Sequence, residues 1–195
     1  MKIVLATHNK NKVEEIRDVL SEMLGGCNIM TMDEAGITQE VEENGITFEE
    51  NAMLKARAVW SKGVIALADD SGLCVNALNG EPGILSARYA GEPSDTQKNN
   101  AKLLFELKNK MDRSAYFVCT FACIMPDGES FTVRGTVDGV ILDEPRGNGG
   151  FGYDPLFLYE PLGKAFAELT KEEKHEVSHR GNALRLLKDE LVKRL

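Results

Sequence analysis

The sequence predicts an α/β protein with a mixed β-sheet, because strand and helix patterns alternate early, a hairpin follows, and a helix closes the chain. The apolar run Ile3–Ala6 is typical of a buried strand. Directly after it, Val13, Ile16, Val19 and Leu20 recur at helical spacing and form one apolar face. This succession of strand and helix is the unit from which α/β folds are built.

Helix start signals occur at three places: Thr47-x-x-Glu50, Ser94-x-x-Gln97 and Thr170-x-x-Glu173. In such a capping box, the first hydroxyl accepts a hydrogen bond from the backbone N–H three residues later. A last helix is expected from about Ser178, with Leu184, Leu187 and Leu191 facing inward.

Strand patterns fill the middle of the chain. Val64–Ala68 predicts a second buried strand, which we expect to end at Asp69-Asp70-Ser71-Gly72. Tyr116–Met125 and Ser130–Val137 also look like strands, and Pro126-Asp127-Gly128-Glu129 between them is a strong hairpin signal.

Composition indicates a soluble globular protein. At 195 residues the chain suffices for a single domain, residues 1–195, with two lobes. The net charge of -8 argues against a nucleic-acid polymer as partner, since phosphate backbones need a basic surface. No apolar run reaches membrane-spanning length, so no membrane partner is expected. The four cysteines form no CxxC pair, which favours reduced thiols in a cytoplasmic protein.

The stretch from Gly147 to Pro155 reads Gly-Asn-Gly-Gly-Phe-Gly-Tyr-Asp-Pro and favours a binding loop for a flat, polar ring. Glycine lets the backbone approach a ligand closely, the aromatics offer flat faces, and Asp154 offers acceptors. The alternative is a hairpin turn that exposes two aromatics by chance. Ordinary turns need only one or two glycines, so we favour the ligand interpretation.

Two segments have the chemistry of a phosphate and metal site. The turn after the first strand contains Thr7, His8, Asn9, Lys10, Asn11 and Lys12. A helix N-terminus with lysines suits phosphate, although a helix start with surface lysines explains these residues equally well. The Asp69–Asp70 pair, expected at a strand end, suits Mg²⁺ or the activation of water, and its alternative is turn chemistry. The acidic run Glu40–Gly45 would complete a metal site only if it lies beside that pair.

Near the C-terminus, Lys174 is a point charge suited to phosphate, and His179 and Arg180 stand where the last helix begins. Both offer hydrogen-bond donors. The plainer interpretation of His179 is a histidine that caps a helix. Together, these segments provide the types of residue that a Mg²⁺-dependent nucleotide enzyme needs.

Six motifs in this order carry a resemblance that covers essentially the whole chain. They are Thr7-x-Asn9-x-x-Lys12, Thr47-Phe48-x-Glu50-Asn51-Ala52-x-x-Lys55-Ala56, Asp69-Asp70-Ser71-Gly72-Leu73, Ser86-Ala87-Arg88-Tyr89, Gly149-Gly150-Phe151-Gly152-Tyr153-Asp154-Pro155 and Ser178-His179-Arg180. The chain resembles the inosine triphosphate pyrophosphatase family. It departs from the usual pattern at Asn148, where most members have Thr, and at His8, where many have Gly.

The resemblance implies hydrolysis of ITP, dITP or XTP to the monophosphate and pyrophosphate, which clears deaminated purines from the nucleotide pool. It implies an elongated mixed sheet with two lobes around a central cleft, and a homodimer. Thr7 to Lys12 would bind the triphosphate. Asp70 would bind Mg²⁺ and accept the proton of the attacking water, with Ser71 touching the substrate.

By the same resemblance, Glu42 would be the partner metal ligand, with Glu43 as a near alternative. The residues Phe151, Gly152, Tyr153 and Asp154 would hold the base. Lys174 would contact phosphate or sugar, while His179 and Arg180 would read the 6-keto edge, which adenine lacks. Adenine would leave these donors without a hydrogen-bond partner, at a cost of ~1–3 kcal/mol or more in binding free energy.

Two other functions stay open at this point. A Maf-like pyrophosphatase would act on pyrimidine or modified nucleotides and would turn over UTP or dTTP fastest. A nucleotide-binding module would bind ITP without Mg²⁺-dependent release of pyrophosphate. The Asp69–Asp70 pair argues against such a module, because a protein that only binds needs no base.

Overall fold

The computed structural model describes residues 2–7, 9–24, 27–38 and 41–195. The chain divides into two compact units. Unit 1 comprises Met1–Asp70, Cys119–Gly135 and Ala183–Leu195, and unit 2 comprises Ser71–Val118 and Thr136–Asn182. The predicted single domain with two lobes stays a prediction.

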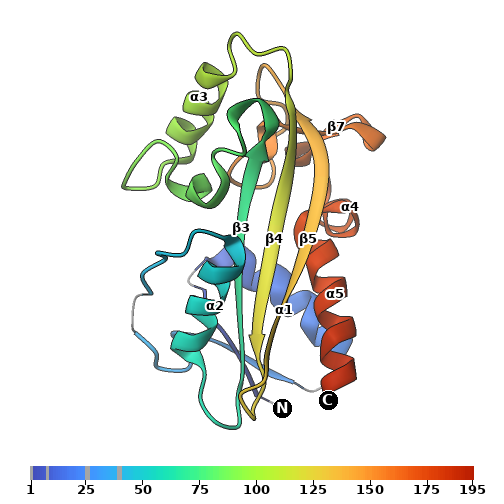
Figure 1. Ribbon diagram of the computed structural model, residues 1–195. Helices are drawn as coiled ribbons and strands as arrows, with labels where there is room; N and C mark the ends of the chain where they lie inside the picture. The colour runs from blue at the N-terminus through green and yellow to red at the C-terminus, as the bar shows by residue number, and fades with distance from the viewer. Residues whose placement is uncertain (1, 8, 25–26, 39–40) are drawn as a thin grey trace. The chain divides into compact units, whose positions relative to one another are not determined.

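The described strands form one mixed, seven-stranded sheet in the order β2-β1-β3-β4-β5-β6-β7 (Figure 1). Strand β1 pairs in parallel with β2 and β3, whereas β6 pairs antiparallel with β5 and β7. The strands are β1 (Lys2–Leu5), β2 (Asn28–Thr31), β3 (Ile65–Val75), β4 (Ser114–Ile124), β5 (Ser130–Ile141), β6 (Phe157–Tyr159) and β7 (Lys164–Ala165). The predicted mixed α/β fold and the β4–β5 hairpin are confirmed.

The helices are α1 (Lys10–Leu24), α2 (Phe48–Val59), α3 (Thr96–Glu106), α4 (Lys171–Val177) and α5 (His179–Arg194). The predicted caps at Thr47 and Thr170 are confirmed, since each hydroxyl accepts a backbone N–H at 3.1 Å. The prediction of Ser94 as a cap is wrong. Asp95 caps α3 instead, accepting from two backbone N–H groups at 3.0 and 3.1 Å.

Strand β3 is longer than predicted. It does not end at Ala68 but continues through Asp69-Asp70-Ser71-Gly72 to Val75. Its partner β1 stops at Leu5, opposite Leu67, where the chain turns toward α1. The acidic pair therefore lies inside β3 and just beyond the carboxyl end of β1.

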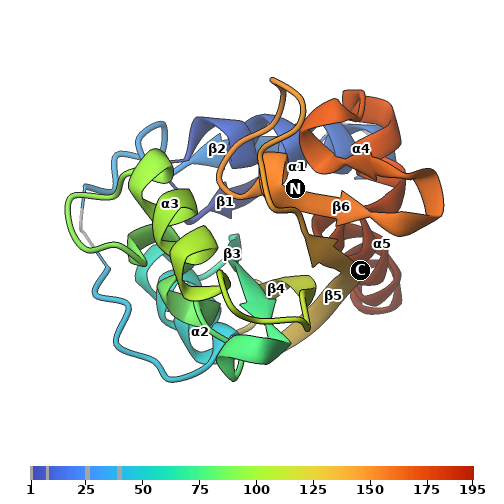
Figure 2. The same ribbon diagram turned by 90° about the horizontal axis from the view of Figure 1, so that it is seen from above.

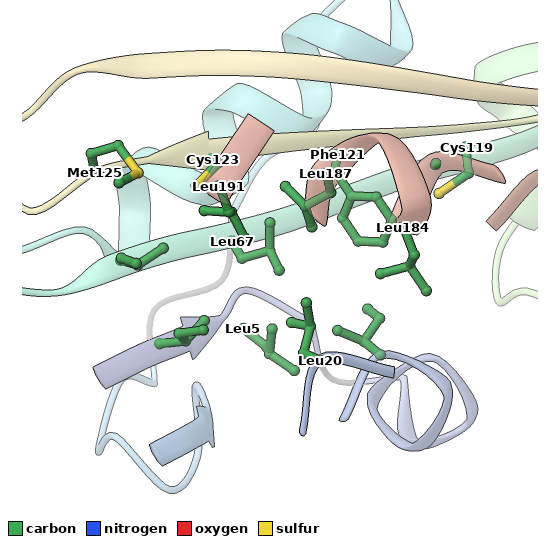
Figure 3. Close-up of a cluster of buried hydrophobic side chains, with 14 residues drawn as sticks. Leu5, Leu20, Leu67, Cys119, Phe121, Cys123, Met125, Leu184, Leu187 and Leu191 are labelled. Atoms are coloured by element: carbon green, nitrogen blue, oxygen red, sulfur yellow. The ribbon is translucent and has the colours of Figure 1, made fainter. Parts of the chain in front are cut away.

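Side chains alternate across the sheet in unit 1 and build a separate core on each face. On one face, Leu5, Leu67 and Phe121 pack with α1 and α5 (Figure 3). On the other, Ala66 and its neighbours pack with Ala52, Ala56 and Val59 of α2. The predicted inward residues Val13, Ile16, Leu20, Leu184, Leu187 and Leu191 are buried, while the side chain of Val19 lies outside the described set.

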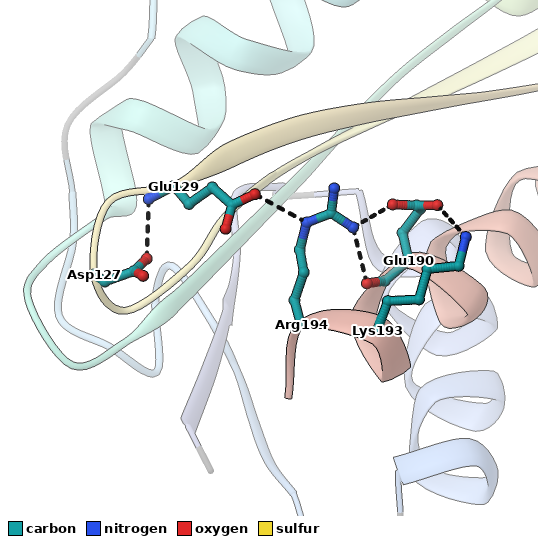
Figure 4. A network of polar contacts seen from close by, with 5 residues as sticks. All are labelled: Asp127, Glu129, Glu190, Lys193 and Arg194. Atoms are coloured by element: carbon teal, nitrogen blue, oxygen red, sulfur yellow. Dashed lines mark hydrogen bonds and ion pairs between the residues drawn. The ribbon is translucent and has the colours of Figure 1, made fainter.

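A polar network holds the last turn of α5 against the β4–β5 hairpin in unit 1 (Figure 4). Arg194 pairs with Glu129 of the hairpin at 3.3 Å and with Glu190 one turn earlier on α5. Its guanidinium also lies 4.3 Å from the centroid of the Phe131 ring. The end of the chain is thus tied to the sheet by charge as well as by packing.

Unit 2 has its own core, in which Phe117, Phe157 and Phe166 pack together. Helix α3 lies beside the 3-10 segment Gly83–Arg88 in both views (Figure 2). Asn99 of α3 fixes this contact by donating to the Ala87 carbonyl at 2.9 Å. Within the described part of the chain, no helix combines the length and the apolarity that a membrane span requires.

Candidate active site

The turn between β1 and α1 is built as a capped helix start. The Asn9 side chain accepts the Lys12 N–H at 3.3 Å, and the Asn9 N–H donates to the Thr7 hydroxyl at 3.2 Å. His8 lies outside the described residues, as do the side chains of Lys10 and Asn11. The Lys12 ammonium does not extend into solvent but lies 2.7 Å from the fully buried carboxylate of Asp69.

Asp69 and Asp70 do not act as a pair on one side of the sheet. Consecutive strand residues point to opposite faces. Asp69 therefore lies on the α1 face, where it meets Lys12, and Asp70 lies on the α2 face, where it meets Lys55 at 3.0 Å. This corrects the interpretation of the two carboxylates as one cluster, because each has its own lysine.

The cluster around Asp70 contains Lys55, Asn51 and Glu43, all within unit 1. The Lys55 ammonium lies 3.0 Å from Asp70 and 3.4 Å from Glu43, so two carboxylates share one cation. The buried Asn51 amide donates to Asp70 at 3.4 Å and accepts the Gly45 N–H at 2.9 Å. Asn51 thereby ties the acidic loop to the strand that carries Asp70.

Burial controls the protonation of this cluster. It raises the pKa of the Asp70 carboxyl, and Glu43 adds to the rise while Lys55 and Lys12 oppose it. Burial also disfavours the charged form of Lys55, but the surrounding carboxylates, Asp70 foremost, outweigh it and raise the pKa of Lys55. Lys55 is therefore a fixed cation beside a carboxylate that binds a proton more readily than an exposed aspartate.

The acidic loop is described from residue 41 onward, so Glu40 lies outside the described residues. Glu42 is exposed, whereas Glu43 is half-buried beside Lys55. The loop thus brings at least one of the two predicted metal-ligand candidates to the Asp70 cluster.

In unit 2, Asp154 organises the glycine-rich loop. Its carboxylate accepts the Phe151 N–H at 2.7 Å and the Lys174 ammonium at 2.6 Å, and only 4% of its side chain is exposed. At position 150, where φ is 71°, any side chain would collide with this carboxylate, so glycine is required. The loop is therefore held by an ion pair between a buried carboxylate and a partly buried ammonium.

The ring of Phe151 is flanked by cations. Lys174 lies 4.8 Å from its centroid and the Arg180 guanidinium 5.6 Å from it. Contacts of this kind are attractive because a cation interacts favourably with the face of an aromatic ring. Three of the predicted binding residues thus meet within unit 2.

The remaining predicted residues of this unit are held by the scaffold. The Tyr153 hydroxyl donates to the Ser86 carbonyl at 2.8 Å, and the Gly152 carbonyl accepts from Asn100 at 3.2 Å. His179, which is buried, stacks on Phe117 with centroids 4.8 Å apart. Ser71 is half-buried in β3, one residue after Asp70.

A cavity of about 710 Å³ in unit 2 contains none of the predicted site residues. It is lined by Val137, Asp138, Tyr159, Glu160, Pro161, Glu176, Val177 and Asn182. Its ionisable lining is entirely acidic, which is unsuited to a polyanion such as a triphosphate. This cavity is therefore a poor candidate for the predicted nucleotide site.

Sequence reasoning gave no site role to Lys55, Asn51 or Phe117, although the first two stand in one of the six motifs. A signal existed for the first two, because residues four apart share a face of the helix that Thr47 caps. Phe117 carried no such signal, since an aromatic residue in an apolar strand looks like any other core residue.

These features define a mixed α/β protein with a carboxylate–lysine cluster in one unit and a loop clamped by an aspartate in the other. The chain belongs to the Ham1 family, whose model matches residues 3–190. It is 49% identical over 199 residues to a dITP/XTP pyrophosphatase of Clostridium perfringens, covering 97% of each chain. A dITP/XTP pyrophosphatase of Bacillus subtilis is 48% identical over 188 residues, which cover 94% of this chain and 93% of that one.

Solved structures agree with this assignment. The Staphylococcus aureus Ham1 protein is 44% identical, with a TM-score of 0.89 over 100% of both chains. A HAM1 protein from Coxiella burnetii is 39% identical, with a TM-score of 0.90 over 99% of both chains. At these identities the likeness extends beyond the fold to the family.

The ion pair between Asp154 of the glycine-rich loop and Lys174 leads to a stability prediction. Asp154→Asn keeps the shape of the side chain but leaves the partly buried Lys174 ammonium without its charged acceptor. We expect a loss of about 1–3 kcal/mol in the free energy of unfolding, measured by urea denaturation. Asp143→Asn is the control, because its 90% exposed carboxylate also pairs with a cation, Arg113, yet should cost only about 0–1 kcal/mol. Equal losses in both variants would show that the Asp154–Lys174 ion pair adds no more stability than an exposed ion pair does.

Proposed function

We propose that this protein hydrolyses the purine nucleoside triphosphates ITP, dITP and XTP to the monophosphate and pyrophosphate. The observation that carries the proposal is the Asp70–Lys55–Glu43 cluster, which places a buried carboxylate of raised pKa beside a fixed cation. Its relatives bear the name dITP/XTP pyrophosphatase at 48–49% identity over nearly their full length, which supports the same substrates here.

In the proposed reaction, the oxygen of water bonds to the α-phosphorus, and the bond from that phosphorus to the oxygen that bridges the α and β phosphates breaks. Asp70 accepts the proton of the attacking water, and pyrophosphate leaves with the bridging oxygen. A raised pKa suits this role, because a base works best when its pKa is near the working pH. Lys12 and the N-terminus of α1 would neutralise phosphate charge.

The donor set around Asp70 fits Mg²⁺. Asp70 and Glu43 supply two carboxylates against the single ammonium of Lys55, which leaves one negative charge in excess. Mg²⁺ prefers one or two carboxylates together with substrate phosphates and water. Asp70 would hold the ion with Glu42 or Glu43, and the bound ion would supply charge neutralisation at the phosphates.

Base recognition is assigned to unit 2. His179 and Arg180 would donate to the 6-keto oxygen of hypoxanthine or xanthine, and the backbone of Phe151 to Asp154 would hold the ring. Lys174 would contact phosphate or sugar. Because the Asp154 carboxylate already accepts two donors, we assign it the role of holding Phe151 and Lys174 in place rather than of reading the base. The homodimer and the cytoplasmic location remain predictions.

The proposal is tested by measuring pyrophosphate release from ITP, XTP, ATP, dTTP and UTP with and without Mg²⁺. We expect ITP and XTP to be fastest and the release to require Mg²⁺. Asp70→Asn should lower turnover of ITP at least about 100-fold while ITP binding is largely kept, because the variant lacks the base.

Asp18→Asn, an exposed change on α1, is the control for this variant and should keep wild-type turnover. Fastest release from UTP or dTTP would instead favour the Maf-like alternative. Preserved turnover in Asp70→Asn would remove Asp70 from the role of base.

Two neighbouring substitutions decide which glutamate assists Asp70 in holding the metal. Glu42→Gln and Glu43→Gln each remove one negative charge from the same loop. We expect substitution of the glutamate that holds the metal to raise the Mg²⁺ concentration for half-maximal activity about tenfold or more, because a group that supports metal binding is lost. Substitution of the other glutamate should have a smaller effect. Equal and small shifts in both variants would exclude the loop from the metal site.

Selectivity for the 6-keto edge should depend on Arg180. Arg180→Ala is expected to reduce the ratio of kcat/KM for ITP over that for ATP by about tenfold or more, since one charged donor is worth ~1.5–3 kcal/mol. Arg185→Ala, an exposed arginine on the same helix, is the matched control and should leave the ratio unchanged. An unchanged ratio in Arg180→Ala would move base recognition to other residues.

A further inference from the structure

We propose that Phe117 is a positioning residue that determines specificity by fixing the imidazole of His179. The inference rests on the proposed function, because it concerns the residue that would read the 6-keto edge. Phe117 belongs to β4 and His179 opens α5, so the two are far apart in sequence but lie together in unit 2.

The rings of Phe117 and His179 are stacked face to face. Their centroids lie 4.8 Å apart, and their planes differ by only 17°. Both residues are buried, with 6% of Phe117 and 5% of His179 exposed. Stacked aromatic pairs of this geometry attract each other beyond the simple burial of area.

Stacking has a directional consequence for histidine. The two ring nitrogens form hydrogen bonds in the plane of the imidazole, whereas stacking engages its face. A partner that fixes the plane therefore fixes the directions in which His179 can donate. A donor aimed in advance discriminates better, since a wrong substrate cannot be accommodated by rotating the ring.

Phe117 also contacts two other aromatic rings of the core. Phe157 lies 4.5 Å from it at 48°, and Phe166 lies 5.7 Å from it at 14°. Phe157 and Phe166 also contact each other at 4.8 Å. The ring that stacks on His179 thus belongs to a packed aromatic cluster in the core of unit 2.

The cluster supplies a matched control. Phe157 is fully buried and contacts Phe117 and Phe166, but no ring contact joins it to His179 among the described residues. Phe117→Leu and Phe157→Leu remove the same atoms from the same core, so both should lower stability. Only the first removes the flat face beneath His179.

The experiment measures kcat/KM for ITP and for ATP, together with the melting temperature, in both leucine variants. We expect Phe117→Leu to lower the ITP-over-ATP ratio about three- to tenfold, the range that the stacking energy allows. Phe157→Leu should keep the ratio within about twofold at a similar loss of melting temperature. In a His179→Ala background, Phe117→Leu should have no further effect on the ratio.

Four results would overturn the inference: an unchanged ratio in folded Phe117→Leu, an equal fall in Phe157→Leu, a further fall in the His179→Ala background, or no effect of His179→Ala itself. If Phe117→Leu does not fold, Phe117→Met, which keeps more of the volume, takes its place with the same expectations. Failure of the proposed function is distinct, because the wild-type protein would then show no preference for ITP.

Discussion

The alternation of side chains along β3 is the constraint on which the rest of unit 1 depends. Because β3 runs on to Val75, its odd and even residues keep pointing to opposite faces past the apolar part of the strand. Leu67 and Asp69 belong to the face covered by α1, and Ala68 and Asp70 to the face covered by α2. The packing that fixes the apolar residues therefore also decides which helix supplies the counter-charge for each aspartate.

Placing two aspartates inside a sheet is energetically costly, and the structure offsets this cost with separate lysines. Isolated charges are strongly disfavoured away from water, so a buried carboxylate persists only when paired or hydrogen-bonded. Lys12 forms an ion pair with Asp69 on one face of the sheet. On the other face, Lys55 forms an ion pair with Asp70, and Asn51 donates a hydrogen bond to it. Compensation around Asp70 is incomplete, because burial disfavours the charged carboxylate more than Lys55 and Lys12 favour it, and Glu43 adds to the rise in the pKa of Asp70. Raised pKa values of this kind are common among catalytic carboxylates, which accords with the role proposed for Asp70.

Local signals in the sequence predicted the elements well but not their extent. The capping boxes at Thr47 and Thr170 are short-range patterns, and both helices begin where these residues place them. The end of β3 could not be predicted in this way, since Asp-Asp-Ser-Gly has the composition of a turn and becomes strand only through its neighbours in the sheet. The same limit hid the roles of Lys55 and Phe117, because a charge pair or a ring stack depends on residues distant in sequence.

The polar groups of the two units have different kinds of partner. In unit 1, charged groups are held by opposite charges, so changing one carboxylate alters the protonation of its neighbours. In unit 2, aromatic rings lie beside several polar groups in addition to the Asp154–Lys174 ion pair, with Phe151 beside Lys174 and Arg180, and Phe117 beside His179. An aromatic ring fixes a donor without consuming its hydrogen-bonding capacity, which a carboxylate partner would do. Under the proposed function, a ring partner would suit His179, which is to read a neutral base, whereas ion pairs would suit Asp70, which is to handle phosphate and proton charge.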